Sequence, residues 1–430
     1  MDDKVKYLLS LSAVRERSKI VGEAAEAGKL SHFDVHEEQL AEAADFVTSV
    51  IKRDYGPDKF HTIPPHGRWQ HFEVGNVPRI SKLLEEWKQG GCDDLETTRR
   101  LIDLFFVSVL LDAGAGDHWR YVEPGTEREY ERSEGIAVAS LYMFKSLGFA
   151  AAKNDKQPIV DGKGLQDLKT EALADGFQIS DKNPMLGVDS RANLLRSLGK
   201  SLLSQPEIFG PEGRPGNVVD YMKKNSANPS SLDVLVFWDI LQKLLIPIWP
   251  QDRTNVNGQP LGDAWPLSTL KTQTASSADE TAFIQPFHKL TQWLAYSLMV
   301  PFTRILSLQW ENASALTALP EYRNGGLFVD VGVLTLKPAT LQRGISASSD
   351  GTGLPAFSAG DDAIVEWRAM TLVLVDKLYK LVLQRMHGVE LSMAQLLEAG
   401  TWKAGREVAK MKRPDTKSSP IIILSDGTVF

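Results

Sequence analysis

The chain has 430 residues, and its 43% hydrophobic and 24% charged content is typical of a folded globular protein rather than a disordered one. The net charge of -7 argues against broad, charge-driven binding to nucleic acid, which normally needs a basic face. The single cysteine, Cys92, excludes an intramolecular disulfide and a cysteine-rich metal site. Neither a signal peptide nor an apolar run of about 20 residues is visible, so we expect a cytoplasmic protein with no membrane segment.

Helical periodicity dominates the first hundred residues. Apolar positions such as Leu40, Val47 and Ile51 line one face of a helix predicted over residues 36–55, and residues 5–30 follow the same pattern. At about 150 residues a domain, the length allows two or three domains. We expect an N-terminal helical region over residues 1–110 and a second helical domain over 111–430, or one continuous unit of both.

Residues 63–75 read IPPHGRWQHFEVG, where two prolines force an extended start and glycines bracket a polar and aromatic cluster. This stretch is either a structural corner or a loop that presents His66 and Arg68 to a small ligand. Two histidines with one nearby acid and no cysteine are a poor set of metal ligands, so we predict no metal site.

The run over residues 101–121 begins as a buried helix and ends in a small-residue turn at Gly114, Ala115 and Gly116, flanked by Asp112 and Trp119. It lacks the glycine-lysine-serine/threonine ending of a phosphate-binding Walker loop. It also follows no predicted strand, as a dinucleotide-binding fingerprint should. The chemistry of nucleoside triphosphates is therefore unsupported.

Ser133 is predicted to cap a helix over residues 131–144, which is rich in alanine. Arg132 would then lie at the positive end of this helix, where exposed backbone N–H groups favour an anion. Two interpretations stay open, a phosphate site or a capping arrangement alone.

Helical patterns continue through most of the remaining chain. His288 and Lys289 open one of these helices, with Trp293 one turn further on. Loops are expected at 272–281 and 346–361. The absence of a repeated strand-helix rhythm predicts a mostly α fold with few short strands. The predicted segments are a helix in 189–222 that closes at Pro206 and restarts near Pro215, helices in 237–253, 286–302, 364–385 and 397–414, and a short strand and turn from 421.

The stretch over residues 316–337 reads LTALPEYRNGGLFVDVGVLTLK. It places Glu321, Tyr322, Arg323 and an asparagine beside two glycines, with Asp330 further on. A carboxylate beside an arginine is expected to keep a low pKa and to stay ionised, which suits a nucleophile, a base or a cation stabiliser. The alternative is a helix end, in which the charges pair and the glycines form the C-terminal cap.

Many long motifs in this chain resemble those of the uracil catabolism protein four family, in the same order and over nearly the whole length. Membership of this family implies a role in uracil breakdown. The motifs are IPPHGRWQHFEVG, VLLDAGAGDHWRY, RSEGIAVAS, RPGNVVDYM, PFHKLTQWLAYSL, LPEYRNGGLFVDVGVL, EWRAMT, GTWKAGR and SDGTVF.

A more distant resemblance links DSRANLLRSLGKSLL and LTALPEYRNGGLFVDVGVL to the queuosine-nucleotide salvage hydrolases. That family implies a helical core related to DNA glycosylases, here with an N-terminal helical extension, and cleavage of a base from ribose 5′-phosphate. Its motif aspartate falls on Glu321, and its Tyr-Arg pair falls on Tyr322 and Arg323. The glutamate carries its carboxylate further from the backbone, so either the sugar sits deeper or the attacking species is water rather than the side chain itself.

Together these resemblances imply an N-glycosidase that hydrolyses a ring-opened uridine nucleotide, such as ribosylurea phosphate, without a cofactor. The expected partner is this phosphorylated ribosyl small molecule; nucleic acid and membrane are not expected, and the oligomeric state is left open. An amidohydrolase acting on the ureido group and a non-catalytic nucleotide sensor are the alternatives. The expected catalytic residues are Glu321, Asp330 and His288, and the expected substrate-binding residues are Tyr322, Arg323, Lys289, Arg132, Trp119, Asp112, Trp293, Arg68 and His66.

Overall fold

The computed structural model describes residues 2–112, 118–151, 157–251, 253–274, 278–348 and 351–424. Helices dominate these residues, and every strand pairs with one other strand in a two-stranded sheet. The mostly α fold class is therefore confirmed. No helix within these ranges combines the length and the apolar character that crossing a membrane would require.

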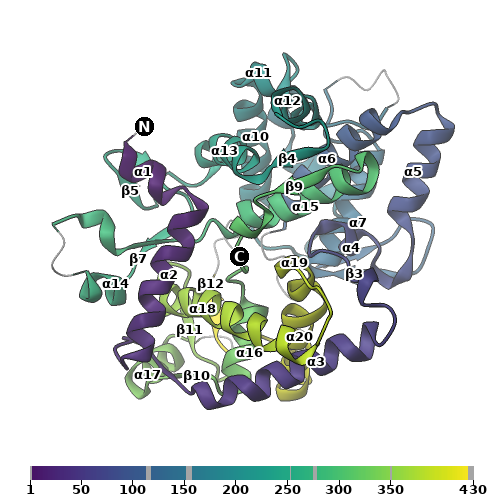
Figure 1. The fold of residues 1–430 in the computed structure, drawn as a ribbon. Helices are drawn as coiled ribbons and strands as arrows, with labels where there is room; N and C mark the ends of the chain where they lie inside the picture. The colour runs from purple at the N-terminus through teal and green to yellow at the C-terminus, as the bar shows by residue number, and fades with distance from the viewer. Residues whose placement is uncertain are drawn as a thin grey trace. The chain divides into compact units, whose positions relative to one another are not determined.

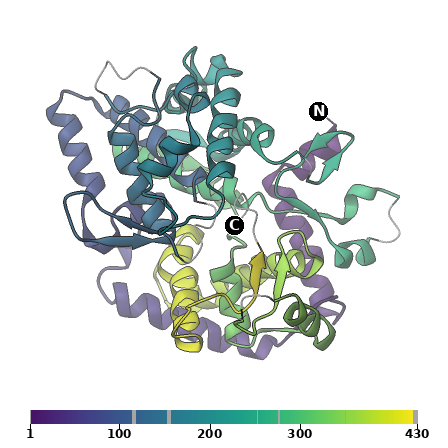
Figure 2. The same cartoon turned by 180° about the vertical axis from the view of Figure 1, so that it is seen from behind.

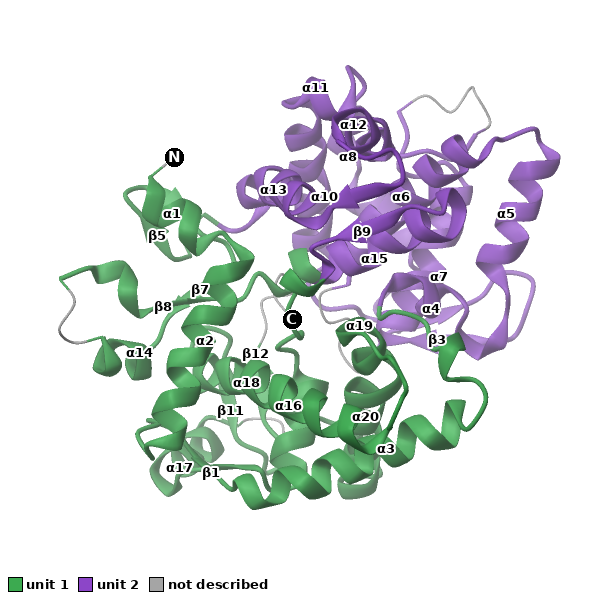
Figure 3. Ribbon diagram, in the orientation of Figure 1, with its two compact units in different colours: residues 1–66, 251–292, 314–425 green, residues 67–250, 293–313, 426–430 purple. Residues whose placement is uncertain are grey.

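The chain divides into two compact units, each made of discontinuous segments (Figure 3). Unit 1 comprises residues 1–66, 251–292 and 314–425, and unit 2 comprises residues 67–250, 293–313 and 426–430. Most of the predicted site residues around Glu321 belong to unit 1.

Unit 1 is built around the long helix α18 (Asp362–Arg385), which contacts α2 (Leu11–Glu26), α3 (Leu40–Tyr55) and α16 (Tyr322–Asp330) (Figure 1). This helix is central because apolar residues cover almost its whole circumference, and a helix of that kind is stable only when it is buried. The other helices of unit 1 are α1 (Asp3–Leu8), α2 (Leu11–Glu26), η1 (Glu37–Gln39), α3 (Leu40–Tyr55), η2 (Phe60–Thr62), α14 (Ser268–Gln273), η6 (Glu280–Phe283), α16 (Tyr322–Asp330), α17 (Pro338–Ala347), α19 (Met393–Leu396), the π-helical turn η8 (Leu397–Thr401) and α20 (Trp402–Lys412).

Short strands tie distant parts of unit 1 together. The strand β12 (Ile422–Leu424) lies parallel to β11 (Ala356–Ser358), as Figure 2 shows from behind, and its register places Ile422 beside Ala356. The antiparallel pairs are β1 (Phe33–Val35) with β10 (Leu334–Leu336), β5 (Asn255–Val256) with β6 (Gln259–Pro260), and β7 (Ala264–Pro266) with β8 (Ile284–Pro286), and the parallel pair is β11 (Ala356–Ser358) with β12 (Ile422–Leu424).

Unit 2 packs its helices around α6 (Asp94–Leu110), whose last ten residues are all buried. Helix α15 (Lys289–Leu306) begins in unit 1 and continues in unit 2, whereas η7 (Ala313–Ala315) begins in unit 2 and ends in unit 1. The remaining elements are α4 (Arg68–Phe72), η3 (Val74–Asn76), α5 (Arg79–Gln89), α7 (Arg132–Lys145), α8 (Gly162–Gln166), α9 (Thr170–Gly176), α10 (Val188–Leu203), α11 (Pro206–Phe209), η4 (Pro215–Asn217), α12 (Val218–Asn225), α13 (Val234–Leu245), η5 (Ile246–Ile248), the antiparallel pair β2 (Arg120–Val122) and β3 (Glu129–Glu131), and the parallel pair β4 (Ser231–Asp233) and β9 (Gln309–Glu311).

Two predicted helix starts are wrong. The helix predicted over residues 5–30 is divided into α1 and α2, because Ser10 caps a new helix by accepting a hydrogen bond from the N–H of Ala13. Ser133 does not cap α7; it lies inside the helix, which follows Glu131, and donates its hydroxyl to Asp112 instead.

The structure describes secondary structure within or beside all three segments predicted as loops. Residues 63–75 contain the short helix α4, and the expected loop at 346–361 contains the strand β11. The loop at 272–281 is described only in part, with α14 ending at Gln273 and η6 starting at Glu280. The turn at residues 114–116 and the turn after β12 lie outside the described residues.

Candidate functional site

Glu321 is the N-cap of α16, with an extended backbone (φ -109°, ψ 163°). Its Oε2 accepts a hydrogen bond from the N–H of Arg323 at 2.7 Å, and its Oε1 accepts one from the N–H of Asn324 at 2.6 Å. The amide of Asn324 donates in turn to the carbonyl of Leu319, at 2.9 Å. The predicted alternative of a helix end is therefore wrong, because a helix starts here.

The two glycines lie in the first turns of α16 and form no turn or C-terminal cap. A Cβ atom on Gly325 would lie 2.7 Å from the hydroxyl of Thr371 and 2.9 Å from the indole of Trp367, and one on Gly326 would lie 3.0 Å from Pro420. The glycines therefore let α16 pack closely against α18 and the segment before β12. This close packing holds the Glu321 end of the helix in place.

Burial raises the pKa of Glu321, although the N–H groups of Arg323 and Asn324 and the positive charges of Lys289 and Arg323 act in the opposite direction. Desolvation of a charged carboxylate is the largest effect. The expectation that the neighbouring arginine keeps this pKa low is thus wrong in direction. Lys289, at the start of α15, is thus close enough to Glu321 to act electrostatically on its carboxyl.

Lys289 is the first residue of α15 and His288 precedes it, and both residues are buried. The Nε2 of His288 lies 2.8 Å from the carbonyl oxygen of Leu8, and burial lowers the pKa of the imidazole. A neutral ring that donates to a carbonyl is well suited to a structural role. The backbone N–H of Lys289 donates to Asp263 at 2.9 Å.

Asp330 ends α16 and forms a two-point ion pair with Arg413, with distances of 2.7 and 2.5 Å. Such parallel N–H···O bonds satisfy both carboxylate oxygens. The partner that the sequence did not reveal is therefore an arginine of the loop after α20.

Arg323 lies over the ring of Tyr322, with 4.8 Å from the guanidinium carbon to the ring centroid. Its Nη1 donates to the carbonyl of Lys417 at 2.9 Å, and only 5% of the residue is exposed. Within the described ranges no carboxylate forms an ion pair with Arg323. A buried guanidinium in that situation favours an anion as its partner.

His66 completes the predicted residues of unit 1. Its Nδ1 lies 2.6 Å from the carboxylate of Glu398, and its ring lies 5.9 Å from that of Trp402. The imidazole is thus held by α20 and the turn before it. Among the described residues, no group of three histidine, cysteine or acidic side chains is placed to hold a metal ion.

In unit 2, Arg68 gathers several predicted residues around a fully buried guanidinium. Its Nη1 donates to Asp112 at 2.8 Å and its Nη2 to the carbonyl of Ser108 at 2.6 Å. The guanidinium lies over the ring of Trp293, with 5.0 Å to the centroid. Burial lowers the pKa of Arg68, but the adjacent carboxylate of Asp112 opposes the shift.

Trp119 and Arg132 are the two remaining predicted site residues of unit 2. The indole of Trp119 is fully buried, stacks on Phe177 and donates its N–H to the carbonyl of that residue at 2.9 Å. Arg132 has a φ of +53°, a left-handed conformation that a residue with a Cβ rarely adopts. The structure therefore groups Arg68, Asp112 and Trp293, and places Trp119 in a separate aromatic cluster.

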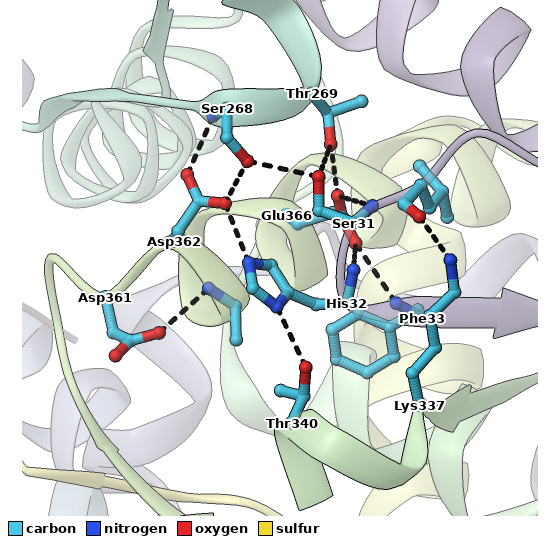
Figure 4. Close-up of polar contacts among 12 residues, drawn as sticks. Ser31, His32, Phe33, Ser268, Thr269, Lys337, Thr340, Asp361, Asp362 and Glu366 are labelled. Atoms are coloured by element: carbon cyan, nitrogen blue, oxygen red, sulfur yellow. Dashed lines mark hydrogen bonds and ion pairs between the residues drawn. The ribbon is translucent and has the colours of Figure 1, made fainter. Parts of the chain in front are cut away.

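A polar cluster around β1 escaped the sequence analysis (Figure 4). The buried carboxylate of Glu366 accepts backbone N–H bonds from Ser31 at 2.8 Å, His32 at 2.7 Å and Phe33 at 3.1 Å. The ring of His32 also contacts the carboxylate of Asp362, at 2.8 Å. These contacts attach β1 to the start of α18 and thereby fix its pairing with β10.

Asp263 and Arg368 are a second pair that sequence reasoning missed. Both Nη atoms of Arg368 donate to the carboxylate of Asp263, at 2.8 Å each, and the pair is buried. The charged residues of α18 appear in the sequence only as interruptions of an apolar helix. That interruption was the available signal, because a charge on a buried helix requires a partner.

Comparison with known proteins finds relatives that align with the whole length of the chain. The family model described as "Protein of unknown function (DUF1688)" matches residues 7–430. Protein urg3 of Schizosaccharomyces pombe is 50% identical over 431 aligned residues, which cover 100% of this chain and 99% of that protein. Uracil catabolism protein 4 of Lachancea kluyveri is 45% identical over 442 residues, which cover 100% of both chains.

Proposed function

The chain belongs to the DUF1688 family, and on this premise we propose that it is a hydrolase of uracil catabolism that cleaves the N-glycosidic bond of a ring-opened uridine nucleotide. The identity of 45% to Uracil catabolism protein 4, over the whole of both chains, is the observation that carries the pathway assignment. The proposed substrate is ribosylurea phosphate. Water is added across the bond, its oxygen going to the anomeric carbon and a proton to the urea nitrogen.

The chemistry requires a negative group beneath the anomeric carbon, because positive charge develops there as the bond to nitrogen lengthens. The buried Glu321 supports this role, since two backbone N–H groups fix its carboxylate in one orientation. Burial strengthens the interaction of such a carboxylate with a developing cation. Only the ionised carboxylate can stabilise a cation, so activity requires a pH above the pKa of Glu321, which the same burial raises.

Arg323 and Lys289 are the proposed partners of the substrate phosphate in unit 1. Arg323 supports this role because it is buried and, among the described residues, has no carboxylate in ion-pair contact. Its planar guanidinium matches a phosphate in two-point geometry. Asp330 and His288 take no proton in this scheme, because their contacts favour structural roles.

The proposal is tested by incubating the purified chain with synthetic ribosylurea 5′-phosphate and measuring urea release. The variant Glu321→Asp retains a carboxylate cap but shortens its reach, and is expected to lower kcat at least about tenfold. Asp161→Asn is the matched control, because Asp161 is also a buried cap that accepts two backbone N–H bonds, from Gly164 at 2.7 Å and Ala151 at 2.9 Å. Urea release that is absent, or equal in wild type and Glu321→Asp, removes the proposal.

A non-catalytic nucleotide-binding protein is the second candidate. The observation that favours it is the occupation of both Glu321 oxygens by backbone N–H groups of its own helix, as in an ordinary capping residue. This candidate predicts that calorimetry detects binding of ribosylurea 5′-phosphate while no product forms. Turnover that depends on Glu321 excludes it.

A further inference from the structure

The buried pair of Asp263 and Arg368 joins segments of unit 1 that are far apart in the sequence. The two Nη atoms of Arg368 donate to the two carboxylate oxygens of Asp263 at 2.8 Å each, and Arg368 is only 2% exposed. A two-point arginine-carboxylate contact fixes orientation as well as distance. The contacts that each partner makes beyond the pair show which segments are held.

Asp263 holds the start of α15. Its carbonyl accepts the backbone N–H of Phe287 at 2.9 Å and that of His288 at 3.1 Å, and its carboxylate accepts that of Lys289 at 2.9 Å. His288 has a φ of +47°, in the left-handed region. A backbone in that region persists only when its surroundings hold it, and such residues cluster at functional sites. Asp263 therefore fixes the backbone at the start of α15, and with it the direction in which the side chain of Lys289 extends.

Arg368 holds the segment that precedes α16. Its Nε donates to the carbonyl of Pro320 at 3.3 Å, one peptide before Glu321. Its guanidinium also lies over the ring of Phe287, with 4.0 Å to the centroid. One guanidinium thus contacts both the backbone before Glu321 and the segment that leads into Lys289.

We propose that Asp263 and Arg368 are positioning residues that hold Glu321 and Lys289 in fixed relation to each other, so that they set the rate of the chemical step rather than substrate affinity. This inference rests on the proposed function, because it takes Glu321 as the reacting carboxylate. The substitution Arg368→Lys keeps the positive charge but replaces the planar guanidinium with a single ammonium group. One ammonium group cannot donate to both carboxylate oxygens of Asp263 and to the carbonyl of Pro320 in the same geometry.

The chain contains a matched control for this pair. In unit 2, Arg79 donates to the carboxylate of Glu123 at two points, 2.7 Å each, and to the carbonyls of Phe72 and Val74 at 2.9 Å each. Both partners are buried. This pair has the same chemistry, but its hydrogen bonds go to neither Glu321 nor Lys289, so Arg79→Lys reports the general effect of losing a buried two-point contact.

The experiment compares Arg368→Lys and Arg79→Lys with wild type, using ribosylurea 5′-phosphate as substrate and hydrogen exchange of the peptides 284–292 and 316–326 as a second readout. Arg368→Lys is expected to lower kcat about tenfold to hundredfold with KM changed less than about twofold, because small displacements of reacting groups cost that much. Both peptides are expected to exchange faster, while the rest of unit 1 keeps its protection. Arg79→Lys is expected to change neither kcat nor these peptides.

The inference is overturned if Arg368→Lys leaves kcat at the wild-type value, if it raises KM alone, or if Arg79→Lys lowers kcat as much. A wild-type protein without turnover removes the proposed function and with it the effect on rate, and hydrogen exchange then decides whether the pair holds the two segments in place. Faster exchange confined to the two peptides supports the positioning role. Unchanged exchange, or a general loss of protection across unit 1, contradicts it.

Discussion

Glu321 combines two properties that oppose each other at the scale of a single residue. Its carboxylate is stabilised by two backbone N–H groups at the start of α16, and destabilised by burial, which raises its pKa. A side chain that only caps a helix does not require burial, since aspartate or serine at the surface does so equally well. The buried position is what makes a chemical role for Glu321 reasonable to propose.

The capping role itself is open to measurement. Glu321→Ala removes both hydrogen bonds to the first turn of α16 and is expected to lower the free energy of unfolding by about 1–2 kcal/mol. Glu321→Asp keeps an acceptor of a preferred capping type, and is expected to stay within about 0.5 kcal/mol of wild type. Urea unfolding followed by circular dichroism measures both values. Equal stability of the alanine variant and wild type would show that the cap contributes nothing.

His288 predicts a pH dependence of stability. Burial lowers its pKa in the folded chain, so between that pKa and the unfolded value of about 6.5 the unfolded chain binds more protons. The stabilisation is complete above about pH 6.5 and is lost as the pH falls through the folded pKa. Asparagine tolerates the left-handed backbone at position 288, so His288→Asn tests this dependence. Below about pH 6.5, the slope of the unfolding free energy against pH is expected to fall by up to about 1.4 kcal/mol per pH unit in this variant.

The exposed residue His61 supplies the control for that measurement. Urea unfolding between pH 5 and 7 is expected to give the same slope for His61→Asn as for wild type. If His288→Asn also keeps the wild-type slope, the buried imidazole does not account for the pH dependence.

At the scale of the element, α16 is a short helix whose position depends on close contact with α18. The sequence allowed its two glycines to be interpreted as a C-terminal cap, but they serve helix packing. The sequence pattern alone cannot distinguish these uses, because it does not show which helix lies opposite. The contacts of Trp367 and Thr371 supply that information.

Gly325→Ala is the substitution that tests this packing. Alanine normally stabilises a helix interior by about 1 kcal/mol relative to glycine. Here the added Cβ would lie 2.7 Å from Thr371 and 2.9 Å from Trp367, so a loss of about 1–3 kcal/mol in unfolding free energy is expected. Gly90→Ala, with φ -75° and no neighbour closer than 3.4 Å, is expected to be neutral. A stabilised Gly325→Ala variant would contradict the close approach of the helices.

Across the whole molecule, the helical segments were largely predictable and their partners were not. The apolar periodicity of residues 364–385 predicts α18 within two residues at its start. Its charged residues Glu366 and Arg368 gave no hint of their partners, which lie 335 and 105 residues away in the sequence at Ser31 and Asp263. The periodicity of apolar residues indicates which face of a helix is buried, whereas an ion pair between residues far apart in the sequence produces no pattern in the sequence around either residue.

The candidate site was predictable to a similar extent. The composition of the stretch around Glu321, together with the family resemblance, singled out Glu321, Arg323 and Lys289, and the structure shows that Lys289 and Arg323 act electrostatically on Glu321. The direction of its pKa shift was not predictable, because the degree of burial depends on α18 and the segment before β12. The catalytic and binding roles of these residues stay predictions.

The pair of Asp263 and Arg368 predicts how unit 1 responds to acid. Burial acts to raise the pKa of Asp263, but the charge and hydrogen bonds of Arg368 outweigh it and the pKa is lowered. The stabilisation is therefore complete above the unfolded value of about 3.9 and is lost as the pH falls through the folded pKa. Asp263→Asn leaves Arg368 buried without its charge partner, at an expected cost of about 3–5 kcal/mol at pH 7.

Urea unfolding at pH 7 and at pH 3.5 distinguishes this explanation from a packing defect. The difference between wild type and Asp263→Asn is expected to shrink at the lower pH, because Asp263 of the unfolded wild-type chain then begins to bind a proton, which stabilises the unfolded state. A difference that stays constant between the two conditions would assign the loss to packing.

The position of the broken bond tests the central claim most directly. Ribosylurea 5′-phosphate carrying heavy isotopes of carbon and nitrogen throughout its ureido group is incubated with the wild-type chain, and the products are identified by mass spectrometry. Cleavage of the N-glycosidic bond predicts intact urea that retains every heavy atom, together with ribose 5-phosphate. Labelled carbon dioxide and ammonia in place of urea would contradict it and would identify the reaction as amide hydrolysis.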